Sequence, residues 1–176
     1  MRPPITIRHA TIADAELLAE LGARTFFETF ASTNTDEDMH QYLLESFNKE
    51  QQTAELQDSR ISALIAESKQ GVAGYAMLQT GPPPNTEIME NPIELVRLYV
   101  SKEWIGQGVG AKLMQASLDE ARRLGHETLW LGVWEHNDRA RSFYHKWGFE
   151  EFGEHIFQLG GDAQNDFLMK RATGDV

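Results

Sequence analysis

The chain of 176 residues contains no cysteine. Disulfide bridges, thiolate metal sites and a cysteine nucleophile are therefore all excluded. No apolar run approaches the roughly 20 residues that a membrane-spanning helix needs. The first residues, Met1-Arg2-Pro3-Pro4, are not typical of a signal peptide. We therefore expect a cytoplasmic protein with no membrane partner.

Closely spaced metal ligands are also lacking. The six histidines show no His-Glu-x-x-His motif or other tight ligand spacing. They are His9, His40, His126, His136, His145 and His155. Each is more typical of a surface or capping residue, and we expect no metal site.

Basic residues are scarce, with 16 Lys and Arg against 27 Asp and Glu, which gives a formal net charge of −11. Contact with nucleic-acid phosphates requires a clustered basic face, so we expect no nucleic-acid partner. The negative charge could instead steer a cationic substrate toward the protein. The simpler alternative is that it serves solubility.

The composition, with 41% apolar and 24% charged residues, is typical of a soluble globular protein. We expect one domain over residues 1–176. Alternating or short apolar runs predict strands over 5–8, 63–66, 72–78, 93–100 and 129–133, with weaker patterns over 152–157 and 167–170. Capping residues and helical spacing predict helices from Thr11, from Thr35 or Asp36, and over 49–56, 110–124 and 138–147. Strands before and between helices indicate a mixed α/β sheet with helices on its faces.

A glycine-rich loop, Gly106-Gln107-Gly108-Val109-Gly110, lies between a predicted strand and a predicted helix. Glycines let the backbone approach a ligand closely, and the start of a helix directs unpaired N–H groups and a positive dipole end at it. The pattern indicates a phosphate or pyrophosphate site, with a flexible turn as the simpler alternative.

Two other nucleotide-binding motifs fit this loop poorly. Gly106-x-Gly108-x-x-Ala111 matches the dinucleotide fingerprint with alanine in the last place. That fingerprint follows its strand directly and normally opens the domain, whereas here residues 101–105 intervene and the loop lies past the middle of the chain. A kinase-type P-loop requires Gly-Lys-Ser/Thr, which is absent.

A second motif is Asn137-x-x-Ala140-x-x-x-Tyr144-x-x-x-Gly148-Phe149. Intervals of three and four predict that its first four named residues share one helical face. Asn137 and Tyr144 would lie about 10 Å apart along the axis, so an extended ligand could meet an amide at one end and a phenol at the other. Taken alone, Tyr144 would be a core aromatic and Asn137 a helix cap.

Together, strand 94–100, the glycine loop and the Asn–Tyr helix resemble the GCN5-related N-acetyltransferase (GNAT) family in order and spacing. The resemblance implies a mixed, mostly antiparallel sheet of about six to seven strands with helices on both faces. It implies acetyl-CoA as cosubstrate and pyrophosphate held by the backbone amides of residues 107–111. The family's loop usually opens with Arg or Gln, and this chain has Ile105 instead.

The same resemblance assigns further residues to the cosubstrate. Pantetheine would pair like a strand with Leu98 and Val100, Asn137 would contact its arm, and Tyr144 would sit near the sulfur. The full implied set is Leu98, Tyr99, Val100, Gly106, Gln107, Gly108, Val109, Gly110, Ala111, Asn137, Tyr144 and Lys146.

The likeness extends along nearly the whole chain to bacterial PaiA-type spermidine/spermine acetyltransferases. It is carried by Phe27-Glu28-Thr29-Phe30, Glu37-Asp38-Met39, Tyr42-Leu43 and Leu131-Gly132-Val133-Trp134-Glu135-x-Asn137. It implies a small-molecule amine as substrate, with Phe27, Glu28, Phe30 and Trp134 in its site beside the proline loop 81–85. Such phenylalanines are more often core residues, and the acidic run 36–38 is more typical of a helix N-terminus whose dipole it complements. We also allow for a homodimer.

Transfer to an amine requires a neutral nitrogen, and at pH 7 an alkylamine with pKa near 10.4 is neutral only at a cost of about 4.6 kcal/mol. Glu94 is the candidate general base, because some family members carry a catalytic glutamate at this strand position. A solvent-facing glutamate is the alternative. Tyr144 is the candidate general acid. Since no cysteine is present, we expect direct transfer in a ternary complex.

Other functions remain open at this point. The acceptor could be a protein N-terminus, a lysine or an amino-sugar. A non-catalytic acetyl-CoA sensor is disfavoured, because a sensor needs neither Tyr144 nor a base.

Overall fold

The computed structural model describes residues 3–84 and 89–174 of the chain. Seven strands form one sheet, in the order β1-β2-β3-β4-β5-β7-β6. The strands are β1 (Thr6–His9), β2 (Ile61–Ser68), β3 (Gly71–Thr80), β4 (Pro92–Val100), β5 (Thr128–Trp134), β6 (Glu150–Leu159) and β7 (Asp162–Ala172). Neighbours are antiparallel except β4 and β5, which are parallel. The expected mixed, mostly antiparallel sheet is confirmed.

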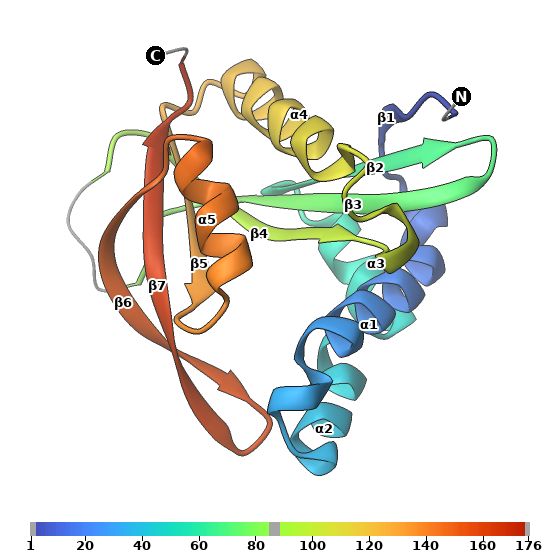
Figure 1. The fold of residues 1–176 in the computed structure, drawn as a ribbon. Coiled ribbons are helices and arrows are strands. Elements are labelled where there is room, and N and C mark those ends of the chain that lie inside the picture. Colours follow the sequence, from blue (N-terminus) through green and yellow to red (C-terminus); the bar gives the residue numbers. More distant parts are fainter. Residues whose placement is uncertain (1–2, 85–88, 175–176) are drawn as a thin grey trace.

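Five α-helices accompany the sheet (Figure 1). They are α1 (Ala15–Phe30), α2 (Asp36–Ser46), α3 (Lys49–Gln57), α4 (Val109–Arg123) and α5 (Asp138–Lys146). Each begins within a few residues of its predicted start, although a 3₁₀ turn over Ile12–Asp14 precedes α1. Strands β6 and β7 are several residues longer than predicted. Among the described residues, no helix is long and apolar enough to cross a membrane.

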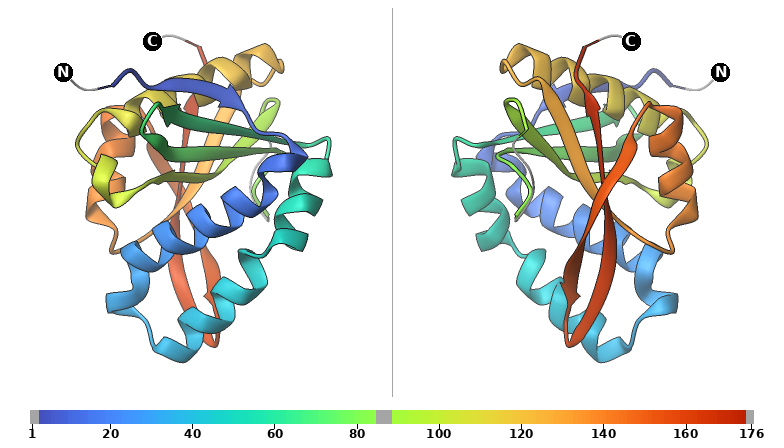
Figure 2. Two further views of the ribbon diagram at one scale, coloured as in Figure 1. Left: turned by 90° about the vertical axis from the view of Figure 1, so that its right-hand side faces the viewer. Right: turned by 90° about the vertical axis from the view of Figure 1, so that its left-hand side faces the viewer.

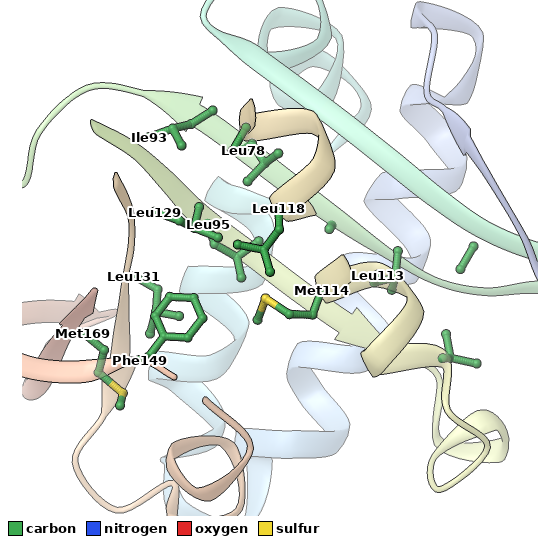
Figure 3. Packing of buried hydrophobic residues seen from close by; sticks show 14 of the residues in the cluster. Leu78, Ile93, Leu95, Leu113, Met114, Leu118, Leu129, Leu131, Phe149 and Met169 are labelled. Carbon is green, nitrogen blue, oxygen red and sulfur yellow. The ribbon is translucent and has the colours of Figure 1, made fainter. Parts of the chain in front are cut away.

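Residues along a strand alternate in direction, so the sheet has two faces with side chains to bury. Different helices cover these two faces. The largest buried cluster joins α4 to the sheet (Figure 3). It includes Leu78, Ile93, Leu95, Leu113, Met114, Leu118, Leu129, Leu131, Phe149 and Met169. Burying each large apolar side chain contributes about 1.5–3 kcal/mol. This layer therefore holds α4, and with it the N-terminus of α4, firmly in place.

The opposite face is covered by α1, α2 and α3 (Figure 2). Leu18 and Leu21 of α1 pack against Ile65, Tyr75 and Met77, which point away from α4. A further cluster of Phe26, Met39, Phe47 and Leu159 joins α1 and α2 to the far end of β6. Helices therefore lie on both faces, as the sequence predicted.

The sheet opens between β4 and β5. Only Pro92–Glu94 pair with Thr128–Trp130, although β4 continues to Val100 and β5 to Trp134. After these pairs the two strands separate (Figure 1). Residues 95–100 and 131–134 therefore have no described strand partner on their shared side. Their backbone polar groups there need another partner, and an extended ligand could supply it.

The β6–β7 hairpin extends from the sheet toward α2 (Figure 1). At its tip the Gly161 N–H donates a hydrogen bond of 2.6 Å to Asp38 Oδ1. The Gln164 side chain donates another to Asn34, between α1 and α2. These contacts tie the helical layer to the hairpin and fix the spacing between them.

Candidate active site

A cleft with a volume of about 610 Å³ lies where β4 and β5 separate. Its walls come from α1, α2, β4, the glycine loop, β5, α5 and the β6–β7 hairpin. Most of the predicted site residues line it. These are Phe30, Glu94, Leu98, Tyr99, Val100, Gly106, Gly108, Val109, Gly110, Ala111, Trp134, Asn137 and Tyr144.

At one end of the cleft lies the N-terminus of α4. Gly108 caps this helix in a left-handed conformation, with φ 81°, which glycine adopts without strain. The N–H of Lys112 is the first to bond back, to the Gly108 carbonyl at 3.1 Å. The N–H groups of residues 108–111 therefore have no described acceptor and face an anion site.

One part of the predicted amide set needs correction. The N–H of Gln107 already donates to the Trp104 carbonyl at 3.2 Å, because a 3₁₀ turn over Lys102–Trp104 tightens the loop. Its side chain donates to the Glu103 carbonyl. Gln107 does not line the cleft, so the available amides are those of residues 108–111 rather than 107–111.

The second motif lies on α5, but not all of it is helical. Asn137 is the N-cap, and its Oδ1 accepts the Ala140 N–H at 3.2 Å. Gly148 follows the helix, so only positions 140 and 144 of the motif lie within it. Because Oδ1 is occupied, the Asn137 side-chain NH₂ is the group left for a ligand. The cap and the ligand interpretations are therefore compatible. Lys146 is exposed and does not line the cleft.

Glu94 lies at the closed end of the cleft, where β4 and β5 begin to separate, because it is the last residue of β4 that pairs with β5. Its carboxylate lines the cleft and has no hydrogen-bond or ion-pair partner among the described residues. Burial raises its pKa to about 7, and the positive charge of Arg97 offsets part of that rise. A carboxylate with this pKa is poised to accept a proton near neutral pH.

A β-bulge explains why Arg97 acts on Glu94. Arg97 pairs with Met77 and Leu95 pairs with Leu78, so Val96 is the extra residue in β4. The bulge keeps Arg97 on the same face of the sheet as Glu94. The Arg97 guanidinium is occupied there by a bidentate ion pair with Glu55, with N–O distances of 2.8 and 3.0 Å. Glu94 therefore retains a raised pKa.

Tyr144 lines the cleft on α5, and burial raises its pKa to about 12. A phenol of this pKa cannot readily give its proton to a thiolate whose conjugate acid has pKa near 8.5, since the transfer is uphill by about 5 kcal/mol. It can donate a strong hydrogen bond to that sulfur and remain protonated. A pKa of about 12 favours this hydrogen-bond role over the acid role expected from the sequence.

The acceptor side of the cleft is aromatic. Phe30 and Trp134 line it with ring centroids 6.0 Å apart. Phe27, which is 52% exposed, and Glu28 do not line it. On a helix with 3.6 residues per turn, the face carrying Phe26 and Phe30 excludes positions 27 and 28. Pro82, Pro83 and Pro84 are absent from the lining as well, and Asn85 lies outside the described residues.

Several lining residues were missed by the sequence analysis. They are Arg97, Gly132, Arg139, His155 and Asp166. Arg139 follows the Asn137 cap by two positions, so the motif itself could have indicated it. Asp166 and His155 come from strands with weak patterns, and only the sheet register brings them to the cleft.

The chain is similar in sequence to known acetyltransferases. The sequence profile described as "Acetyltransferase (GNAT) family" matches residues 19–149. An uncharacterised N-acetyltransferase in the pepI 3′ region of Lactobacillus delbrueckii subsp. lactis is 35% identical over 86% of this chain and 88% of its own. A spermidine N(1)-acetyltransferase of Thermoplasma acidophilum is 27% identical over 95% and 96%. The N-alpha-acetyltransferase RimI of Mycobacterium tuberculosis is 29% identical over 98% and 95%.

The fold is also similar to that of a solved N-acetyltransferase. The crystal structure of PaiA N-acetyltransferase from Thermoplasma acidophilum in complex with coenzyme A matches with a TM-score of 0.75 and 25% identity. The match covers 96% of this chain and 99% of that one.

A splayed sheet with a free helix N-terminus at one end and a half-buried carboxylate at the other suits an extended, phosphate-bearing cosubstrate. The chain belongs to the acetyltransferase (GNAT) family, and it is an acetyl-CoA-dependent N-acetyltransferase. The residues present fit that cosubstrate. The free amides of residues 108–111 would hold its phosphates, the unpaired edge of β4 would pair with its pantetheine, and Arg139 lines the cleft without a described ion-pair partner.

A first prediction concerns the N-terminus of α4. Gly108→Asp should weaken acetyl-CoA binding at least tenfold, because the new carboxylate repels phosphate and competes for the N–H groups of the first turn. Isothermal titration calorimetry on the folded variant measures the change.

Gly125→Asp is the matched control, because Gly125 also has a left-handed backbone, with φ 83°, but lies beyond the other end of α4. It should keep wild-type affinity. Equal affinity in both folded variants would place the phosphates elsewhere.

Proposed function

We propose that the enzyme acetylates a primary amine of a polyamine such as spermidine or spermine, by direct attack within a ternary complex. The observation that carries the chemistry is the half-buried, unpaired Glu94 carboxylate at the closed end of the cleft. Bound acetyl-CoA supplies the activated acetyl group as a thioester.

Glu94 acts as the general base in this proposal. It takes the proton from the incoming ammonium, directly or through one water molecule, and so supplies the neutral nitrogen. Moving its pKa from 4.5 to about 7 makes that transfer about 3 kcal/mol less unfavourable than for an ordinary glutamate. The group is nevertheless ionised in about half of the molecules at pH 7.

Two other groups stabilise charge as the bond changes. Backbone N–H groups along the unpaired edge of β4 can polarise the carbonyl oxygen, as donors in an oxyanion hole do. The Tyr144 phenol donates a hydrogen bond to the departing sulfur and keeps its own proton. The C–N bond forms as the C–S bond breaks, coenzyme A leaves as the thiolate, and the second proton of the nitrogen passes to solvent, so no covalent acyl-enzyme is needed.

The polyamine acceptor is supported by three separate observations. The net charge of −11 favours approach of a polycation. A relative of similar length is named a spermidine N(1)-acetyltransferase. The acceptor side of the cleft combines aromatic rings with carboxylates, and both attract ammonium groups.

A second prediction concerns pH. With a monoamine acceptor, log kcat/KM should rise with a slope of about one below pH 7 and level off above it, since Glu94 must be ionised to take the proton of the ammonium. Glu94→Gln should lower kcat/KM at pH 7 by about 10²-fold or more and leave a slope of about one that continues above pH 7, because the amine must then lose its proton in solution.

Glu90→Gln, an exposed change just before β4, serves as the control for this series and should preserve the break. An unchanged break near pH 7 in Glu94→Gln would show that another group is the base.

A third prediction concerns Tyr144. Tyr144→Phe should lower kcat by about 10- to 100-fold, the value of a hydrogen bond to a charged group. Acetyl-CoA affinity and the thermal midpoint should stay close to those of the wild type, because the ring contacts with Phe143 and Phe149 remain. A kcat within twofold of the wild type would reduce Tyr144 to a packing residue.

A fourth prediction tests the acceptor itself. A thiol-release assay should compare kcat/KM for spermidine, spermine, monoamines, amino-sugars and peptides with a free N-terminus or lysine. The polyamines should lead, and their values should fall more with added salt than those of monoamines, because screening shortens to about 10 Å at 0.1 M. A tenfold advantage for a peptide or an amino-sugar would reject the polyamine.

A further inference from the structure

The cleft contains a second buried carboxylate that the proposed chemistry does not use. Asp166 of β7 is only 8% exposed, yet it lines the cleft. It has no hydrogen-bond or ion-pair partner anywhere in the part of the chain that the structure describes. Burial, and to a lesser extent the negative charge of Glu135, raise its pKa to about 6. An isolated buried carboxylate is unfavourable unless a cation comes to it.

The register of the sheet places Asp166 on the face that lines the cleft. Asp166 is level with Trp134 on β5 and with His155 on β6, and paired residues share one face of a sheet. Gly132 lies on this face two residues before Trp134. A Cβ at Gly132 would sit 3.3 Å from Asp166 Oδ2 and 3.1 Å from His155 Nε2. The missing side chain thus leaves a passage in front of the carboxylate.

Aromatic rings line the same cleft as Asp166. Trp134, which is paired with Asp166 across β5 and β7, contacts Phe30, and Tyr42 contacts Phe157 with ring centroids 5.5 Å apart. Burial raises the pKa of Tyr42, Arg97 and Ser46 lower it in part, and the charge of Asp166 adds a smaller rise. A carboxylate in a cleft lined by aromatic rings suits an ammonium group.

The donor set points to an organic cation. Within residues 3–84 and 89–174, no group of three or more His, Asp or Glu side chains is arranged to hold a metal ion. Burial lowers the pKa of His155, so this histidine is neutral at physiological pH and cannot neutralise Asp166. The remaining partner is a cation carried by the ligand.

We propose that Asp166, in the cleft that Phe30, Tyr42, Trp134 and Phe157 also line, binds a second, protonated nitrogen of the acceptor while Glu94 serves the reacting one. This rests on the proposed function and deepens it. Glu94 is level with Trp130 and Asp166 with Trp134, so four residues, about 13 Å, separate them along β5. An acceptor with well-separated nitrogens suits that span.

The test compares an α,ω-diaminoalkane and spermidine with an n-alkylamine of the same chain length. In Asp166→Asn, kcat/KM for the diamine and for spermidine should fall tenfold or more, while the monoamine changes less than twofold. The ratio between amines cancels any general effect of the substitution. The thermal midpoint should stay level or rise, since an uncompensated buried charge is removed.

Glu154→Gln is the matched control, because Glu154 is an exposed acid on the neighbouring strand that does not line the cleft. It should leave all amines unchanged. Gly132→Ala is an independent variant, since its methyl group fills the passage, and it should also penalise the diamine selectively. An equal loss for monoamine and diamine in Asp166→Asn, or no loss for either, would overturn the proposal.

A binding measurement separates this inference from the proposed function. Calorimetric titration of spermidine into the CoA-bound enzyme should show an affinity that Asp166→Asn weakens at least tenfold. Binding of this kind without acetylation would keep the subsite and reject the polyamine as substrate. Binding that does not depend on Asp166 would reject the subsite, and no binding at all would reject both.

Discussion

The structure depends on how briefly β4 and β5 pair. Three residue pairs join them, and beyond these the parallel strands separate. A right-handed crossover through α4 then brings the end of β4 and the free N–H groups of α4 to one side of the gap, while α5 follows β5 on the other. If the pairing continued, the sheet would satisfy its own backbone groups and leave no room for an extended ligand. The gap is therefore both a cost in sheet hydrogen bonds and the origin of the binding site.

The chemistry of the gap depends on where one arginine is held. The bulge at Val96 brings Arg97 to the face of Glu94, and a direct ion pair would hold the pKa of Glu94 low. Glu55 prevents this by accepting hydrogen bonds from both Nη1 and Nη2 of Arg97, and Phe47 covers the guanidinium at 4.9 Å. The side chains of Arg97 and Glu55 are only 10% and 14% exposed. The ion pair between α3 and β4 thus leaves Glu94 free to titrate near neutral pH.

The sequence predicted the parts of the site that depend on local patterns, but not the parts that depend on contacts between distant segments. Glycines 106 and 108, the Asn137 cap and the Glu94 strand could be found because each lies in a short segment whose pattern determines its own geometry. Strands β6 and β7 were underestimated because their outer halves alternate weakly. Asp166 was missed for the same reason, since its role depends on register across three strands. Phe27 and Glu28 were wrongly placed through resemblance, although helical periodicity alone separates them from Phe30.

The acidic residues fall into two groups in this structure, those on the surface and those that line the cleft. Asp36, Glu37 and Asp38 lie in the first turn of α2, where they complement the helix dipole, and Asp38 also holds the hairpin. They contribute to the field that draws a cation in, but their contribution is screened by salt and does not distinguish one amine from another. Glu94 and Asp166 are different, because both line the cleft, Asp166 buried and Glu94 half-buried, and both lack a partner within the described chain. Screening by salt reaches them weakly. In our proposal the surface charge steers cations toward the protein, and these two carboxylates select among them.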